Sequence, residues 1–442
     1  MATSIFESQI LGALFPVGDI GHLFTDRAEL RALLIVEGAL ANAQGTLGLI
    51  PSQCAERIHK ASLEVQFDPF QLRDGATQNG VCVPSLITLF RESLPDPEDR
   101  DFVHFGATSQ DIIDTALMLR MKQVLLKQEE CLKSLLSHLG DMAQRHATLA
   151  CVARTYAQNA APTSFGAIVA QWGMPLVRLL EELKEVRENV LFVSLSGAVG
   201  TSAALGEQSD ELRQEFAKSL GLNVPPAGWH TERAPLSALI SWQMSLCTAL
   251  GKIATDVMDF AHSGRALVSL GKSGASSTLP QKKNPVQPSA ILATIRYAQS
   301  VQGCLLQSQI HGDARDGVSW FTEWIALPQM ILASSSALIN ARDMIEALTP
   351  DKTAIAREVA SSKGLIYAEA LTFQLASDMG RVAASEAIKS LCAEVAANDE
   401  RSLLEEAQKR FPALSTYDPQ TALGDAPERA LAFARHVKDS LP

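Results

Sequence analysis

The chain has 442 residues, of which 47% are hydrophobic and only 6% aromatic, and its formal net charge is -11. This length and apolar content suffice for a large buried core, and the abundance of Ala and Leu favours close-packed helices over sheets. The acidic balance, without a basic run or interleaved aromatic and basic residues, argues against nucleic acid as a partner.

Residues 1–105 are expected to form an N-terminal helical domain. Apolar side chains recur at helical spacing across residues 27–44, and Asp26 stands where it can cap this helix. Five prolines from Pro51 to Pro97 exclude long helices from the part that follows.

A long helix is predicted to begin near Ser109. The string His-Phe-Gly-Ala-Thr-Ser-Gln-Asp at residues 104–111 ends in a Thr-x-x-Asp capping pattern, and a long amphipathic run follows. The free N–H groups and the positive dipole end of such a helix can seat a carboxylate, and the hydroxyls of Thr108 and Ser109 can add donors. Taken alone, the same pattern is more often only a helix cap.

Further along, long Ala- and Leu-rich stretches lack the alternation of strands, as is typical of the helices of a large bundle. They cover residues 163–195, 236–269, 285–310 and 320–348. We therefore expect an all-α fold with a central long-helix domain at 106–350 and a small C-terminal helical domain at 351–442.

Two breaks interrupt these helices. Gly197, Gly200 and Gly206 favour a tight turn with a structural role. Residues 311–317 carry Arg315, which can hold a substrate carboxylate through two hydrogen bonds, although an exposed salt bridge explains an arginine there equally well.

Residues 271–285 lack apolar periodicity and are expected to form a loop. Glycines at its start and three lysines within twelve residues would attract a small anion to an otherwise acidic chain. The hydroxyls of Ser276 and Ser277 lie between the glycines and the lysines, where one of them can act as a base. By composition alone, a flexible and solvated linker is the more common explanation.

The order of residues in this loop resembles the signature of the fumarase/aspartase superfamily. Residues 275–285 read Ala-Ser-Ser-Thr-Leu-Pro-Gln-Lys-Lys-Asn-Pro, against the usual Gly-Ser-Ser-x-Met-Pro-x-Lys-x-Asn-Pro, with Ala275 and Leu279 as departures. The stretch at 104–111 resembles a second region of the superfamily, in which a Thr-Ser or Ser-Ser pair binds a substrate carboxylate. Residues 153–163 resemble a third, the Gly-Arg-Thr-His-x-Gln-x-Ala-x-Pro-x-Thr element.

The third region differs at an informative position. Tyr156 stands where many members carry a histidine, and Ser289 stands where fumarases and adenylosuccinate lyases carry the glutamate that orients this histidine. Losing both partners together suggests a branch whose proton transfer does not use the pair. Bacterial 3-carboxy-cis,cis-muconate cycloisomerases form such a branch, and the stretches at 103–111, 229–233, 320–328 and 364–370 resemble theirs.

The resemblance implies a cycloisomerase of aromatic catabolism that converts 3-carboxy-cis,cis-muconate into a carboxymuconolactone. One substrate carboxylate adds to the conjugated double bond, and a proton is transferred at the carbon next to another carboxylate. The resemblance assigns Ser276 as the proton carrier, with Ser277 beside it, and leaves open which cation meets which carboxylate. The residues that it implies for substrate binding are His104, Thr108, Ser109, Arg154, Thr155, Tyr156, Gln158, Arg233, Lys282, Asn284 and Arg315.

Cofactors, partners and location can also be predicted. We expect no metal or organic cofactor, because neither metal-ligand spacing nor a phosphate-binding glycine motif occurs. Seven cysteines without a Cys-x-x-Cys pair argue against a disulfide framework and favour a reducing cytoplasm. Neither a run of about eighteen apolar residues nor a signal peptide is visible, so no membrane partner is expected. The resemblance also implies a homotetramer with active sites shared between subunits.

Two other interpretations remain open. One is another lyase of the superfamily, of the adenylosuccinate, argininosuccinate or fumarase type, against which Tyr156 and Ser289 count. The other is a helical scaffold that kept the fold and lost activity, against which the intact Ser276, Lys282 and Asn284 count. The natural substrate stays open, since a substituted muconate fits the same motifs.

Overall fold

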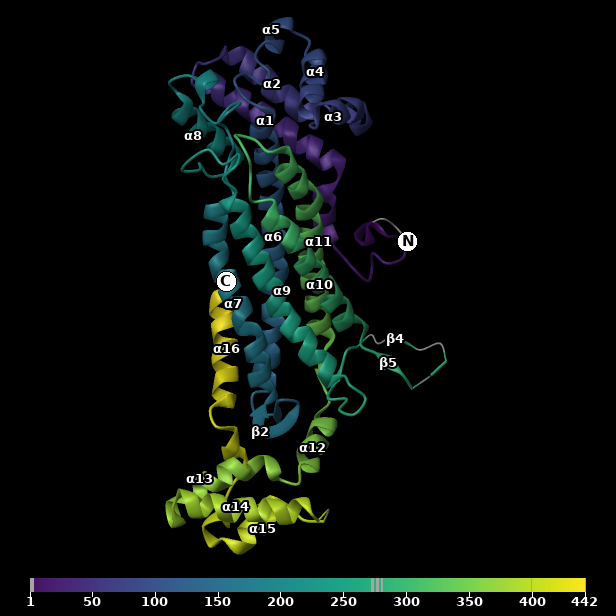
Figure 1. The fold of residues 1–442 in the computed structure, drawn as a ribbon, viewed down its shortest axis with the longest axis vertical. Helices are drawn as coiled ribbons and strands as arrows, with labels where there is room; N and C mark the ends of the chain where they lie inside the picture. The colour runs from purple at the N-terminus through teal and green to yellow at the C-terminus, as the bar shows by residue number, and fades with distance from the viewer. Residues whose placement is uncertain (1–3, 272–273, 276–277, 280, 399, 442) are drawn as a thin grey trace. The chain divides into compact units, whose positions relative to one another are not determined.

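The computed structural model describes residues 4–271, 274–275, 278–279, 281–398 and 400–441. Helices dominate these residues, which confirms the predicted all-α fold (Figure 1). The long helices are α6 (Ser109–Arg145), α7 (Phe165–Val190), α9 (Ala234–Phe260), α10 (Val286–Gln307) and α11 (Gly317–Ala347).

Shorter helices precede, interrupt and follow them. They are α1 (Asp26–Thr46), α2 (Ser52–Glu64), α3 (Arg73–Asn79), α4 (Val83–Ser93), α5 (Pro97–Arg100), α8 (Ser209–Leu220), α12 (Lys352–Ser361), α13 (Ala368–Met379), α14 (Arg381–Ala396), α15 (Leu403–Arg410) and α16 (Ala426–Ser440). Short 3-10 turns are η1 (Ile5–Glu7), η2 (Gly18–Phe24), η3 (Pro69–Leu72), η4 (Ala203–Leu205), η5 (Leu365–Tyr367), η6 (Pro412–Leu414) and η7 (Pro419–Leu423).

Strands occur as small antiparallel pairs, which the helical reading of the sequence did not predict. β1 (Ala150–Thr155) pairs with β2 (Gln158–Ser164), β3 (Val268–Ser269) with β6 (Thr349–Pro350), and β4 (Gly274–Ala275) with β5 (Lys283–Asn284). The expectation that residues 271–285 hold no regular element was therefore wrong for β4 and β5.

The chain divides into two compact units. Unit 1 comprises Met1–Cys131, Leu179–Thr248 and Ala293–Ile339, and unit 2 comprises Leu132–Arg178, Ala249–Leu292 and Asn340–Pro442. Each of the long helices starts in one unit and ends in the other. The domain boundaries predicted near residues 105 and 350 stay a prediction.

Apolar periodicity predicted the long helices correctly but located their ends only approximately. The helix predicted at 163–195 ends at Val190, because the next residues are extended and hydrogen-bond to a distant segment: Val193 N donates to Asn223 O at 2.9 Å. At the start of α1, the side chain of Thr25, and not of Asp26, accepts the capping hydrogen bond from Ala28 N. Thr25 has extended backbone angles whereas Asp26 is already helical, so only Thr25 can cap.

In unit 1, α1 packs closely against α2. A Cβ atom on Gly38 would lie 1.9 Å from Ser62 Oγ, and one on Gly45 would lie 2.3 Å from Ala55 Cβ. Glycine at these two positions lets the helix backbones approach and bury side chains such as Leu33 and Ile58.

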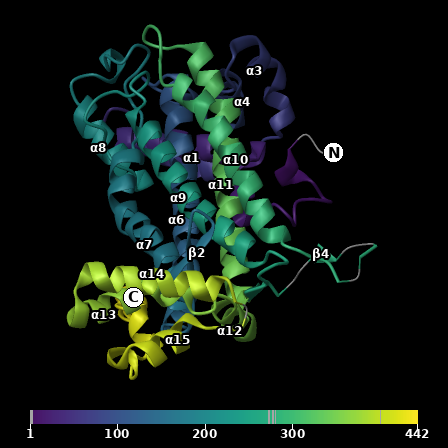
Figure 2. The ribbon, with the colours of Figure 1, turned by 60° about the horizontal axis from the view of Figure 1, so that its bottom comes forward.

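In unit 2, helices α13, α14 and α15 lie together (Figure 2). They share a hydrophobic core. Leu371, Ile388 and Leu403 are among its buried side chains. α16 packs on α7, where a Cβ atom on Gly173 would lie 2.0 Å from Cζ of the buried Phe433.

Among the described helices, α11 is the one long and apolar enough to cross a membrane. Because 72% of its most apolar window is buried inside the protein, α11 has the composition and the burial of a core helix.

The contact between Gly173 and Phe433 predicts a specific packing cost. We expect Gly173→Ala to lower the free energy of unfolding by about 1–3 kcal/mol, because the buried ring has no room to move aside. In a Phe433→Leu background the same substitution should cost less, because leucine lacks the ring atoms that the new methyl group would strike. Thermal unfolding of the four proteins measures this difference, and equal losses in both backgrounds would contradict the packing.

Candidate functional site

The predicted site residues lie in both units, and each group is described by itself. Unit 1 holds His104, Thr108, Ser109, Arg233 and Arg315, and unit 2 holds Arg154, Thr155, Tyr156, Gln158, Lys282 and Asn284. Ser276 and Ser277, the predicted proton carriers, lie outside the described residues.

A buried carboxylate, Asp111, organises the start of α6. Its two oxygens accept N–H donors from the backbone of Thr108 at 3.0 Å, Ser196 at 2.8 Å and Gly197 at 3.0 Å. His230 Nε2 lies 2.8 Å from Asp111 Oδ1. The Thr-x-x-Asp pattern is thus a real cap, and the same carboxylate also fixes the turn that follows residue 195.

That turn has the backbone that its glycines predict. Gly197, Gly200 and Gly206 all have φ between 75° and 80°, a region that favours glycine. The positive φ angles fit the predicted tight turn, and its structural role stays a prediction. His230 was not predicted as a site residue; the only sequence signal for it was the Trp-His-Thr-Glu-Arg string at 229–233.

Arg315 reaches the start of α6, where its acceptors among the described residues are neutral. Its Nε donates to Gln110 Oε1 at 2.9 Å, and its Nη2 donates to Thr108 Oγ1 at 3.1 Å and to Ala198 O at 3.3 Å. Within the part of the chain that the structure describes, Arg315 has no carboxylate partner, so the alternative of an exposed salt bridge was wrong. A solvent-accessible cation therefore stands beside the hydroxyl of Thr108.

Arg233, in contrast, is enclosed by carboxylates. Its Nη1 donates to Asp114 Oδ2 at 2.8 Å, and its Nη2 donates to Glu323 Oε2 at 2.6 Å, with all three side chains buried. Its guanidinium also lies over the ring of Trp229, 4.7 Å from the centroid. Burial would lower the pKa of Arg233, but the charges of Asp114 and Glu323 outweigh this effect and raise it.

His104 lies just before the cap in a strained backbone conformation, with φ of 62°. Its Nδ1 lies 2.7 Å from Oε1 of the buried Glu37. Burial lowers the pKa of His104, yet the Glu37 carboxylate outweighs it, so the pKa is raised and the ring readily takes a proton. The histidine is thereby tied to α1.

In unit 2 the β1–β2 hairpin carries four of the predicted residues, Arg154, Thr155, Tyr156 and Gln158. Arg154 Nη2 donates to Glu358 Oε1 at 3.0 Å, and Arg265 Nε donates to the same oxygen at 2.7 Å, so Arg154 already has a carboxylate partner. Thr155 and Gln158 pair across the hairpin. Between them Tyr156 and Ala157 have φ of 50° and 59°, as a two-residue hairpin turn requires.

Tyr156 stands at the tip of this turn with its side chain fully in solvent in the isolated chain. Pairing of β4 with β5 places Gly274 opposite Asn284 and Ala275 opposite Lys283. Lys282 is exposed, and its backbone N–H donates to Leu279 O at 3.0 Å. Lys282 directly precedes β5, and Asn284 is the last residue of β5.

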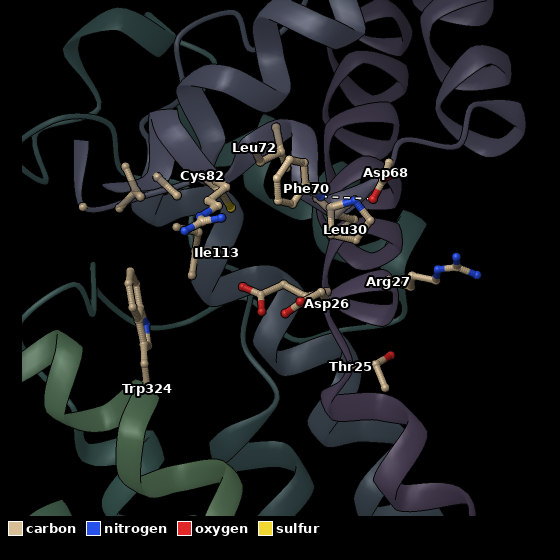
Figure 3. A pocket seen from close by; sticks show the side chains of 16 residues that line it. Thr25, Asp26, Arg27, Leu30, Asp68, Phe70, Leu72, Cys82, Ile113 and Trp324 are labelled. Carbon is tan, nitrogen blue, oxygen red and sulfur yellow. Dashed lines mark hydrogen bonds between the residues drawn. The ribbon is translucent and has the colours of Figure 1, made fainter. Parts of the chain in front are cut away.

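A cavity of about 830 Å³ opens in unit 1 and is lined by residues from α1, α6 and α11 (Figure 3). It contains three carboxylates and two arginines, namely Asp26, Glu29, Asp68, Arg27 and Arg73. None of the predicted site residues that the structure describes lines it. Because its charge is net negative, this cavity suits a polycarboxylate poorly.

The described residues hold neither a cluster of metal-ligating side chains nor a disulfide. Among them, no group of three or more His, Cys, Asp or Glu side chains is arranged to hold a metal ion. All seven cysteines, each within the described ranges, are free thiols. Burial raises the pKa of Cys151 and of Cys247 to about 12, so neither thiol ionises near neutral pH.

Known proteins resemble this chain over most of its length. The protein family described as "Lyase" matches residues 17–303. A 3-carboxy-cis,cis-muconate cycloisomerase of Pseudomonas aeruginosa is 32% identical over 87% of this chain and 85% of its own length. An N-acetyl-S-(2-succino)cysteine lyase of Enterococcus italicus is 29% identical over 97% of this chain and 92% of its own length.

Among solved structures, the 3-carboxy-cis,cis-muconate lactonizing enzyme of Pseudomonas putida superposes with a TM-score of 0.90 at 27% identity. The match covers 98% of this chain and 100% of that one. The sequence motifs, the long-helix architecture and these similarities agree. The chain therefore belongs to the lyase family, within the fumarase/aspartase superfamily.

Proposed function

We propose that the protein is a cycloisomerase that converts 3-carboxy-cis,cis-muconate into a carboxymuconolactone. The observation that carries the proposal is the similarity, over nearly the whole chain, to a cycloisomerase and to a lactonizing enzyme named for this substrate. Tyr156 and Ser289 support it, because they replace the histidine and glutamate that other lyases of the superfamily use for proton transfer.

The reaction takes up one proton, which lowers the net negative charge of the substrate by one. An oxygen of one substrate carboxylate forms a C–O bond to an alkene carbon, and the π electrons move into the neighbouring carboxylate as an enediolate. A proton then adds to the carbon next to that carboxylate. The trianion becomes a lactone with two carboxylates, and water reprotonates the proton donor.

Ser276 is the proposed proton carrier, with Ser277 beside it. A serine hydroxyl gives up its proton only near strong hydrogen-bond donors and cations, and the enediolate needs the same stabilisation. Lys282 and Asn284 follow on the same segment and supply an ammonium group and an amide. These roles rest on the match to the superfamily signature.

The substrate carboxylates require cations that are not already neutralised. Arg315, with neutral partners at the start of α6, is the proposed first contact, together with Thr108 and Ser109. Arg233 is enclosed by Asp114 and Glu323, so we propose that it does not contact the substrate and acts through these neighbours. Arg154 would have to share Glu358 with Arg265 or exchange it for substrate.

His104 and the hairpin residues Thr155, Tyr156 and Gln158 complete the proposed site. The raised pKa of His104 comes from its contact with Glu37, which balances its charge, so we propose that His104 hydrogen-bonds the substrate rather than adding a free charge. Tyr156 and its neighbours are exposed in the single chain, which suits contacts supplied by another copy.

We also propose a homotetramer in which several subunits contribute to each site. Unit 1 exposes an apolar surface along α10 and α11, where large side chains would otherwise meet water. Its exposed residues are Tyr297, Leu306, Ile310, Val318, Phe321, Trp324 and Ile325. Val318 and Ile325 are 79% and 75% exposed and stand seven residues apart, on one face of α11.

We also propose that the protein works in the cytoplasm, in the breakdown of aromatic compounds. Seven free cysteines suit a reducing compartment, and the related cycloisomerases are named for a carboxymuconate.

A second candidate is a lyase that releases fumarate from a succinylated substrate. The similarity to an N-acetyl-S-(2-succino)cysteine lyase, at 29% identity over 97% of the chain, favours it. The two functions differ in product: the cycloisomerase releases no fragment, whereas the lyase releases fumarate.

The first prediction concerns the proton carrier. Ser276→Ala should lower kcat for carboxymuconate about 100-fold or more, because proton transfer by a positioned group contributes on this scale. Ser289→Ala is the matched control and should keep kcat, because its hydroxyl donates to Pro285 O at 2.8 Å within its own helix turn. Loss of ultraviolet absorption of the conjugated substrate measures the rate, and lactone formation identifies the product. Turnover of a succino-thioether or adenylosuccinate without turnover of carboxymuconate would refute the assignment.

The second prediction concerns assembly. Ile325→Lys should shift the protein from four copies of the 47.5 kDa chain to smaller species, because a lysine cannot be buried in an apolar interface without a partner. Val382→Lys, on a residue of α14 that is 74% exposed, is the control and should leave the mass unchanged. Light scattering after gel filtration gives the masses. A wild-type monomer would contradict the tetramer, and an unchanged mass of the Ile325→Lys protein would contradict the proposal that this face of α11 is an interface.

A further inference from the structure

The side-chain amide of Gln110 is fully buried and lies between Asp114 and Arg315. Its Nε2 donates to Asp114 Oδ2 at 3.1 Å and to His230 O at 2.9 Å. Its Oε1 accepts the hydrogen bond from Arg315 Nε at 2.9 Å. Both N–H donors and the carbonyl oxygen of this side chain are therefore in use.

The surroundings allow only one orientation of the Gln110 amide. If it turned over, its oxygen would face the Asp114 carboxylate and the His230 carbonyl, which are both acceptors, and its N–H groups would face the Arg315 guanidinium, which only donates. Unpaired polar groups at a buried position are costly, so the amide oxygen is held toward Arg315.

Asp114 is held in turn by two buried side chains of unit 1, those of Arg233 and Trp320. Arg233 Nη1 and Nη2 donate to its two oxygens at 2.8 and 3.3 Å, and Trp320 Nε1 lies 3.4 Å from Oδ1. Arg233 is anchored by Glu323 through bonds of 2.9 and 2.6 Å. A continuous chain of hydrogen bonds thus runs from Glu323 through Arg233, Asp114 and Gln110 to Arg315.

We propose that Gln110 and Asp114 are positioning residues that aim Arg315 at a substrate carboxylate. The neutral amide orients the guanidinium without cancelling its charge, which a carboxylate at position 110 would do. Asp114 fixes the amide and is itself held by hydrogen bonds from Arg233. This inference rests on the proposed function, in which Arg315 binds a carboxylate of the substrate.

The test is a double-mutant cycle between Gln110 and Arg315. Gln110→Glu should weaken binding of propane-1,2,3-tricarboxylate about tenfold and raise the KM for carboxymuconate similarly, with a smaller change in kcat. In an Arg315→Ala background the same substitution should change either value by less than about twofold, because the positioned group is gone. Calorimetry gives the dissociation constants, and Gln110→Ala replaces Gln110→Glu if the latter does not fold.

Gln128→Ala is the matched control for loss of a buried amide. Gln128 is as buried as Gln110 and hydrogen-bonds Gln243 and Ser335 inside unit 1. It should lower the melting temperature and leave tricarboxylate binding unchanged. Equal losses of affinity in Gln128→Ala and in the Gln110 variants would overturn the positioning role.

The outcomes separate this inference from the proposed function. Additive effects in a protein that turns over carboxymuconate would overturn the positioning role alone. Coupled effects on tricarboxylate binding in a protein without that turnover would overturn the proposed substrate alone. A protein that neither binds the tricarboxylate nor turns over carboxymuconate would overturn both.

Discussion

A buried arginine between two carboxylates fixes the ends of three helices in unit 1. Arg233 directly precedes α9, Asp114 belongs to α6 and Glu323 to α11, and their hydrogen bonds span 2.6 to 3.3 Å. A charge away from water is tolerated only when its partners are in place, and removing one partner of such a pair typically costs about 3–5 kcal/mol. The cluster therefore demands one register of these helices, and the position of Gln110 and Arg315 depends on that register.

The same electrostatics divide the arginines into different roles. Arg233 and Arg154 each have a carboxylate partner, whereas the described partners of Arg315 are an amide, a hydroxyl and a backbone carbonyl. A trianionic substrate gains most from a cation whose charge is not yet cancelled. In a chain of net charge -11, this makes the start of α6 the best candidate in unit 1 for binding a carboxylate.

Sequence patterns predicted the local features and missed those that join distant segments. Apolar periodicity gave the long helices, and the Thr-x-x-Asp pattern gave the cap at Asp111. The contact of Asp111 with His230 joins residues 119 positions apart, and no periodicity encodes such a pair. The sequence also could not show which of Arg154, Arg233 and Arg315 keeps an uncompensated charge. That depends on the carboxylates that the fold brings to Arg154 and Arg233. The β1–β2 hairpin was missed because its turn residues, Tyr156 and Ala157, are unusual at positive φ.

The central claim is that Arg315 is held ready for a substrate carboxylate at the start of α6. A crystal structure of the protein with propane-1,2,3-tricarboxylate bound tests it most directly. The account predicts that a ligand carboxylate accepts hydrogen bonds from the Arg315 guanidinium and from a hydroxyl of Thr108 or Ser109, while Gln110 keeps its contact with Arg315 Nε. A tricarboxylate bound elsewhere, with none of its oxygens within hydrogen-bond distance of Arg315, would contradict the account.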